Sequence, residues 1–175
     1  MTETRWLSPE EREAWLALVN IMFTLPGTIE SQLHVDAGLS LAEYLVLAML
    51  SESPDHRRRM SELATATNTT PSRLSRIAAR LERDGFLVRM GDEQDKRVVL
   101  AEITARGIGK IEGVAPGHVA HVRSTVIDRL TKEQIRHLAL IGRVVEAAAN
   151  GPGARHMASD RLCFGSRPED SCRGK

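Results

Sequence analysis

Three arginines, Arg73, Arg76 and Arg80, are spaced so that an α-helix would bring them onto one face. A guanidinium group can donate two parallel hydrogen bonds to O6 and N7 of guanine, or pair with a phosphate. The same stretch, Thr69 to Gly85, carries aliphatic residues at helical spacing on another side. These are Leu74, Ile77, Ala78 and Leu81. The pattern favours a helix that is buried on one side and touches an anion on the other.

The positions of the arginines along this helix predict different roles in DNA binding. The N-terminal part of a recognition helix makes the base contacts, so Arg73 and Arg76 are the predicted base readers. Arg80, one turn further on, is expected to meet a phosphate. In a later polar loop, Lys96 and Arg97 are expected to reach the sugar-phosphate backbone or the adjacent minor groove. Hydroxyl groups that can contact phosphates or bases come from Thr69, Thr70 and Ser72.

The helix that carries the arginines has clear predicted ends. Thr70 suits the N-cap, Pro71 the first helical position and Gly85 the C-terminal stop. A short helix is predicted from Ser61, and Asn68 follows it where a left-handed turn residue would sit. Together the two helices and the turn form a predicted helix-turn-helix.

After Gly85 the pattern changes from helix to strand. The runs 86–90 and 97–103 are aliphatic and β-branched, and the stretch between them, "GDEQDK", is polar and turn-prone. This predicts a β-hairpin directly after the helix-turn-helix, which is the order of a winged helix. A stripe of arginines on a lone helix is more often a solvated face. The elements on either side of this one favour DNA binding instead.

Two capping boxes predict helices before the helix-turn-helix. Ser8 with Glu11 opens a first helix, and the pair Pro26–Gly27 is expected to bend or interrupt it. Ser40 with Glu43 opens a second helix, which is rich in leucine.

Two further helices are predicted after the hairpin. Thr104 caps a helix that is expected to be kinked at 115–117 and to continue to Leu130. Thr131 with Gln134 forms another capping box, which opens the last helix.

The stretch from Met60 to Gly107 resembles the winged helix of the MarR family of bacterial transcriptional regulators. The flanking helices are also arranged as in that family, so the resemblance covers about residues 8–149. The wing pattern of the family appears here as Asp95, Arg97, Ile103, Thr104 and Gly107.

The resemblance implies a mainly α fold with a small β-hairpin wing. A single domain, 8–149, would contain a winged helix-turn-helix at about 41–103 and dimerisation helices at about 8–34 and 104–149. Residues 150–175 are rich in Gly, Ser and Arg and are predicted to form a flexible C-terminal tail.

The same resemblance implies a homodimer that regulates transcription. A two-fold dimer would bind double-stranded DNA at a pseudo-palindrome with half-sites about one helical turn, ~10 bp, apart. A repressor is favoured, with a small molecule as a possible effector. The Asp95 carboxylate would orient Arg97 or a neighbouring arginine, since a bare carboxylate beside a phosphate is repelled. The alternative hypothesis is a winged helix that binds other proteins without sequence-specific DNA binding.

Composition fits an ordinary globular protein without a membrane span. The chain has 175 residues with a net charge of +1, but residues 57–97 hold ten Lys/Arg and six Asp/Glu, a local excess of +4. This concentration indicates an anionic partner. No apolar run reaches the ~18 residues that span a bilayer, and the N-terminus is too polar for a signal peptide. We therefore expect a cytoplasmic, nucleoid-associated protein.

Other kinds of site have weaker signals. His118 and His121 lie three apart on a predicted helix, a spacing that can place two zinc ligands together, but two partly exposed histidines near the dimer helices are the favoured interpretation. Cys163 and Cys172 could form a redox switch, although a pair of cysteines in a tail is more often inert. The sequence has no Gly-rich phosphate loop and no GxSxG motif, so neither an enzyme nor a cofactor is predicted.

Overall fold

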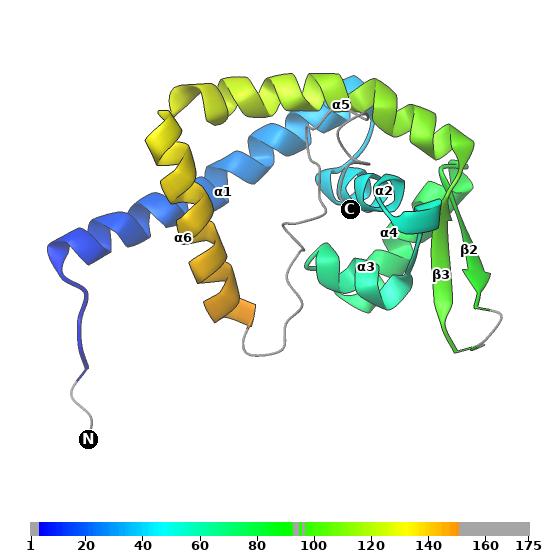
Figure 1. Cartoon of the computed structure of the whole chain (residues 1–175), viewed down its shortest axis with the longest axis horizontal. Helices are drawn as coiled ribbons and strands as arrows, with labels where there is room; N and C mark the ends of the chain where they lie inside the picture. Colours follow the sequence, from blue (N-terminus) through cyan, green and yellow to red (C-terminus); the bar gives the residue numbers. More distant parts are fainter. Residues whose placement is uncertain (1–3, 93–94, 96, 151–175) are drawn as a thin grey trace, which may run out of the picture.

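Helices dominate the chain in the computed structural model, which describes residues 4–92, 95 and 97–150 (Figure 1). The α-helices are α1 (Pro9–Ala37), α2 (Leu41–Ser51), α3 (Met60–Ala66), α4 (Pro71–Arg83), α5 (Ala105–Thr125) and α6 (Lys132–Asn150). The described chain also contains two 3₁₀ turns, η1 (Pro54–His56) and η2 (Ile127–Arg129). Its three strands are β1 (Arg57–Arg59), β2 (Leu87–Gly91) and β3 (Val99–Ile103). The mainly α fold with a small wing is confirmed.

The core lies around α2, which is buried over most of its length. In Figure 1, α5 lies above α2, α3 and α4 lie below it and the sheet lies to one side. Each fully buried Leu or Met side chain contributes roughly 1.5–3 kcal/mol by leaving water. The fully buried leucines and methionine are Leu33, Leu47, Met49, Leu50, Leu63, Leu74, Leu81 and Leu87.

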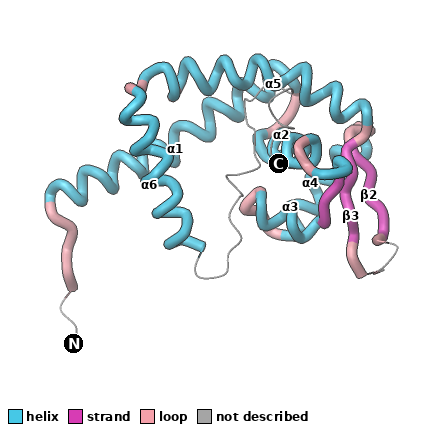
Figure 2. Tube along the Cα trace, in the orientation of Figure 1, coloured by secondary structure: helices cyan, strands magenta, loops and turns pink. Residues whose placement is uncertain are grey.

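The sheet has three antiparallel strands in the order β1-β3-β2. The predicted hairpin is present as β2 and β3, with Leu87 opposite Ile103, and Figure 2 shows the strands grouped at one end of the molecule. The sequence did not reveal β1, because three successive arginines lack the alternation of a half-buried strand. Its pairing depends on the distant β3, and Arg58 is further held by donating to Oγ of the buried Ser53.

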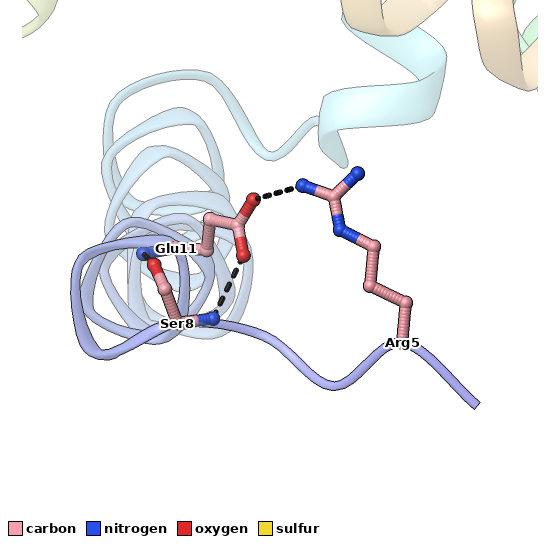
Figure 3. Close-up of polar contacts among 3 residues, drawn as sticks. All are labelled: Arg5, Ser8 and Glu11. Carbon is pink, nitrogen blue, oxygen red and sulfur yellow. Dashed lines mark hydrogen bonds and ion pairs between the residues drawn. The ribbon is translucent and has the colours of Figure 1, made fainter. Parts of the chain in front are cut away.

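Helix starts follow the predicted caps. At the start of α1, the Ser8 backbone N–H donates to Glu11 Oε2 (2.7 Å) and the Glu11 N–H donates to Ser8 Oγ (3.2 Å), while Arg5 reaches the other Glu11 oxygen (Figure 3). The same reciprocal bonds join Thr131 and Gln134 before α6. Each box satisfies N–H groups that have no partner inside the helix.

The expectation that Pro26–Gly27 could interrupt the first helix is wrong. A single helix, α1, runs from Pro9 to Ala37 with Pro26 inside it. Proline removes one backbone hydrogen bond and crowds the carbonyl four residues earlier. Because Pro26 is exposed, that carbonyl can bond to water, and the helix continues on both sides.

The extent of the helix after the hairpin was also mispredicted. Pro116 lies inside α5, which ends at Thr125 rather than continuing to Leu130. A 3₁₀ turn, η2, then forms the corner before α6. There Arg123 pairs with Asp128 (2.6 Å) and Arg129 Nε donates to the Ser124 carbonyl (3.1 Å), so side chains supply partners that a longer helix would have supplied.

None of the described helices is by itself long and apolar enough to cross a membrane. Only α1 and α2 taken together have that length and apolarity, and they are bent by 74°.

Gly107 on α5 is expected to tolerate no side chain. A methyl group there would lie 2.1 Å from the Phe86 carbonyl oxygen and 2.6 Å from Ile103 Cγ1. We expect Gly107→Ala to lower the free energy of unfolding by about 1–3 kcal/mol through overpacking, measured by urea denaturation. Gly109→Ala is the matched control, because nothing lies within 4 Å of a methyl group there. It should raise stability by about 0.5–1 kcal/mol, and equal effects of the two changes would contradict the close packing of α5 on the wing.

Candidate nucleic-acid interface

Local contacts determine where the recognition helix α4 begins and how it is oriented. Thr70 Oγ1 accepts from the Arg73 N–H (3.2 Å) and Pro71 occupies the first turn, as predicted. Asn68 has the predicted left-handed conformation (φ 47°), and the next N–H, that of Thr69, donates to Ala64 of α3 (2.9 Å). Leu74, Ala78 and Leu81 are buried, which turns the arginine face of α4 outward.

Arg73 and Arg76 project from the exposed face of α4. Among the described residues, no carboxylate lies within ion-pair distance of either guanidinium. Both side chains therefore have their donors available for an external acceptor. An exposed α-helix with free arginines matches the width of the major groove and the acceptors of guanine.

Arg80 differs from the other two arginines of α4. Its Nε lies 3.1 Å from Oε1 of Glu43 on α2, and the Glu43 side chain is only 4% exposed. This pair was not predictable from the sequence, because the two residues are far apart along the chain.

The hydroxyl groups at the start of α4 are only partly available. Thr70 Oγ1 is used as the cap and also lies 3.2 Å from Ser72 Oγ. Thr69 Oγ1 is buried and has no hydrogen-bond partner within the described part of the chain. Of the three predicted hydroxyl contacts, Ser72 is on the exposed side of the first turn of α4.

Asp95 shapes the turn of the wing through the backbone. Its Oδ1 accepts from the Arg97 N–H (3.0 Å), and its carbonyl accepts from the Val98 N–H (2.8 Å). The Asp95 N–H in turn contacts Asp92 Oδ1 (3.3 Å). The carboxylate thus holds the backbone of Arg97 rather than its guanidinium. Lys96, the other predicted wing contact, lies outside the described residues.

A second ion pair, not predicted from the sequence, joins the wing to α4. Arg89 on β2 donates to Glu82 Oε2 from Nε (3.0 Å) and from a terminal nitrogen (2.6 Å), and its backbone N–H donates to Oε1 (2.9 Å). These hydrogen bonds hold the pKa of Glu82 below its ordinary value. The wing and the recognition helix are therefore fixed relative to each other.

The Glu82–Arg89 pair predicts a loss of stability in acid. Since the pKa of Glu82 is lowered on folding, its contribution is complete above the ordinary carboxyl pKa of 4.5 and is lost as the pH falls through the lowered value. Urea denaturation at neutral pH and at pH values below 4.5 would give the free energy of unfolding. This free energy should fall less in Glu82→Gln than in the parent as the pH is lowered. Glu112→Gln, at an exposed position of α5, is the control and should behave as the parent does. An unchanged acid dependence in Glu82→Gln would contradict the assignment.

His118 of α5 contacts α1 and α2, and the expectation that it is partly exposed is wrong. His118 is buried, with Nδ1 3.3 Å from Gln32 Oε1 and its ring 4.5 Å from the Tyr44 ring. Burial, and secondarily His121, lower the pKa of His118. No group of three or more His, Cys, Asp or Glu side chains in the described chain is arranged to hold a metal ion. Cys163 and Cys172 lie outside the described residues.

Comparison with known proteins gives the family of this winged helix. The sequence profile of the MarR family matches residues 39–99. The crystal structure of Sco3205, a MarR family transcriptional regulator from Streptomyces coelicolor in complex with DNA, is 39% identical and has a TM-score of 0.82, covering 89% of this chain and 96% of that one. The chain belongs to the MarR family.

Two other relatives agree with this assignment. The crystal structure of AbsC, a MarR family transcriptional regulator from Streptomyces coelicolor, is 36% identical and has a TM-score of 0.78. The match covers 85% of this chain and 100% of the AbsC chain. The transcriptional repressor YetL from Bacillus subtilis is 29% identical over 136 residues, which are 77% of this chain and 80% of YetL. This MarR-family chain is therefore a DNA-binding transcriptional regulator with a winged helix-turn-helix, as its sequence predicted.

Proposed function

We propose that this MarR-family regulator acts as a homodimeric repressor that binds a pseudo-palindromic operator, with one winged helix in each half-site. The observation that carries the proposal is the uncovered apolar surface of the two terminal helices. Similarity to YetL, a transcriptional repressor, supports repression. A repressor also needs only to occupy the promoter, which requires no surface for contact with the polymerase.

The helix α6 is left largely uncovered by the part of the chain that the structure describes. It turns downward from the corner at the end of α5 in the view of Figure 1, and most of its large apolar side chains are exposed. They are Leu138, Leu140, Ile141, Val144 and Val145. Apolar patches of this kind mark interaction sites in soluble proteins, because their exposure to water is unfavourable.

The helix α1 carries a second uncovered apolar surface, and a second copy of the chain can cover both. Its exposed large side chains include Trp15, Leu16, Ile21, Met22 and Phe23. In a two-fold dimer the same patch on each copy is buried against its partner, so one contact covers the apolar faces of both chains. We infer that α1, α5 and α6 form the dimer interface and that residues 8–149 form one domain.

In each half-site, we assign base reading to the N-terminal half of α4. Arg73 and Arg76 are exposed, unpaired among the described residues and carried by a helix with fixed ends. Arg97, in the turn that Asp95 organises, is assigned to the DNA backbone or the adjacent minor groove. A small-molecule effector and a cytoplasmic, nucleoid-associated location stay predictions from the sequence.

In vitro selection tests the proposal directly. Purified protein would be incubated with a pool of random duplexes at near-physiological salt, and bound duplexes would be sequenced after several rounds. We expect an inverted repeat whose half-sites are centred about 10 bp apart. Enrichment of a single, unrepeated motif would contradict dimeric binding, and the absence of any enriched motif would contradict sequence-specific reading by α4.

A further inference from the structure

Glu43 uses both of its carboxylate oxygens inside the winged helix. Its Oε2 accepts from the Ser40 N–H (2.8 Å), which completes the capping box of α2, and its Oε1 faces Arg80 Nε at 3.1 Å. The side chain is almost entirely buried, at 4% exposed. Glu43 therefore connects the start of α2 to the outer face of α4.

The capping box alone does not require a carboxylate at this position. Gln serves equally well as the third residue of a capping box, and this chain uses Gln134 in the box that opens α6. Burial of a carboxylate is unfavourable unless a cation is near it. The buried negative charge at Glu43 suits the N-terminus of α2 and also gains a cation partner in Arg80.

Arg80 is held on one side and open on the other. Its side chain is 52% exposed, and among the described residues no hydrogen bond is formed by its terminal nitrogens. A free arginine loses up to about 2 kcal/mol of rotamer entropy when it is fixed by a ligand. A guanidinium already held through Nε loses less rotamer entropy, so its terminal nitrogens can bind an anion at a smaller entropic cost.

We propose that Glu43 is a positioning residue for DNA binding, which holds Arg80 so that the terminal nitrogens of Arg80 bind a backbone phosphate. The inference rests on the proposed entry of α4 into the major groove. In this arrangement Arg73 and Arg76, which have no ion-pair partner among the described residues, contact the bases. Arg80 is already held by Glu43 of α2 before DNA binds, so its phosphate contact sets the depth and tilt of α4 in the groove. Glu43 itself does not touch DNA.

The sign of one mutational effect separates this role from a purely electrostatic one. Removing a negative charge near DNA normally strengthens binding, because the charge repels phosphates. If Glu43 positions Arg80, Glu43→Gln should instead weaken binding, since Arg80 must then be ordered during association. Glu62→Gln, which removes an exposed negative charge from α3, is the matched control and should leave affinity unchanged or slightly higher.

The experiment is a double-mutant cycle on the full chain with the selected operator. Affinity would be measured across a range of salt concentrations for Glu43→Gln, Arg80→Ala and the double variant, together with urea denaturation of each. We expect each single change to weaken operator binding roughly 5- to 30-fold, and Glu43→Gln to add nothing once Arg80 is absent. Arg80→Ala should lower the salt slope by about one per half-site, whereas Glu43→Gln should preserve it.

A further variant keeps the test decisive if Glu43→Gln folds poorly. Arg80→Lys retains the charge and leaves Glu43 in place, but an ammonium group cannot hold a carboxylate and a phosphate in the same planar geometry. It should weaken binding nearly as much as Arg80→Ala.

Several results would overturn the inference. They are unchanged or tighter binding by Glu43→Gln, an equal weakening by Glu43→Gln with and without Arg80, or binding by Arg80→Lys at the strength of the parent. In all three cases the parent would still prefer the operator to a scrambled duplex, so the proposed function would stand. A parent without that preference would overturn both.

Discussion

Ile141→Asp is expected to separate the dimer and to lower operator affinity by about 10²–10⁴-fold, the factor that linking two binding sites usually contributes. Ile141 is 57% exposed in a single chain, in the middle of the uncovered apolar surface of α6. A carboxylate there would have to be buried against the partner without a cation, which is strongly unfavourable. Analytical ultracentrifugation would report the mass in solution, and titration of labelled operator would report the affinity.

Ala139→Asp provides the matched control for this prediction. Helical spacing places residue 139 nearly opposite Ile141 on α6, so the same charge is introduced outside the apolar surface, with a loss of helix propensity at least as large. This variant should remain dimeric and bind the operator as the parent does. Dimeric Ile141→Asp with the affinity of the parent would show that α6 is not the interface.

Arg76→Ala is expected to reduce discrimination at one base pair in each half-site by about 1–3 kcal/mol, with little change at other positions. The reason is that a bidentate bond to guanine distinguishes one base pair from the rest, and Arg76 has no partner among the described residues that would restrain it. Affinities for a panel of duplexes, each with one substituted base pair, would measure the effect. Arg73→Ala should act in the same way at a different position.

Arg97→Ala is the informative comparison for this second prediction. As a contact to the backbone, Arg97 should contribute to all sequences alike, so its loss should weaken every duplex and reduce the salt slope by about one per half-site. Uniform weakening by Arg76→Ala would mean that Arg76 contacts phosphate and does not read bases. An unchanged salt slope for Arg97→Ala would remove the wing from the assigned interface.

Local features of the sequence correctly predicted most helix starts and the face that α4 buries. The start and end of α4 depend on hydrogen bonds and backbone angles within a few residues, so they can be predicted from the sequence. The residues concerned are Asn68, Thr70, Pro71 and Gly85. The helical spacing of Leu74, Ala78 and Leu81 is likewise a local property of the sequence. The hairpin was predictable for the same reason, because its two strands are neighbours along the chain.

Tertiary structure alone decided the features that depend on distant parts of the chain. β1 is a strand because β3, more than forty residues later, supplies its hydrogen bonds. Arg80 is paired because folding brings Glu43 of α2 beneath it. Where a helix would be broken by local preference, as at Pro26, the exposed position allows water to replace the lost bond. The sequence by itself determined the recognition helix, its arginine face and the wing, since these rest on local capping and periodicity. Which arginines are free to contact DNA and which are already held was decided by packing between elements, because no local pattern records a partner that lies far along the chain.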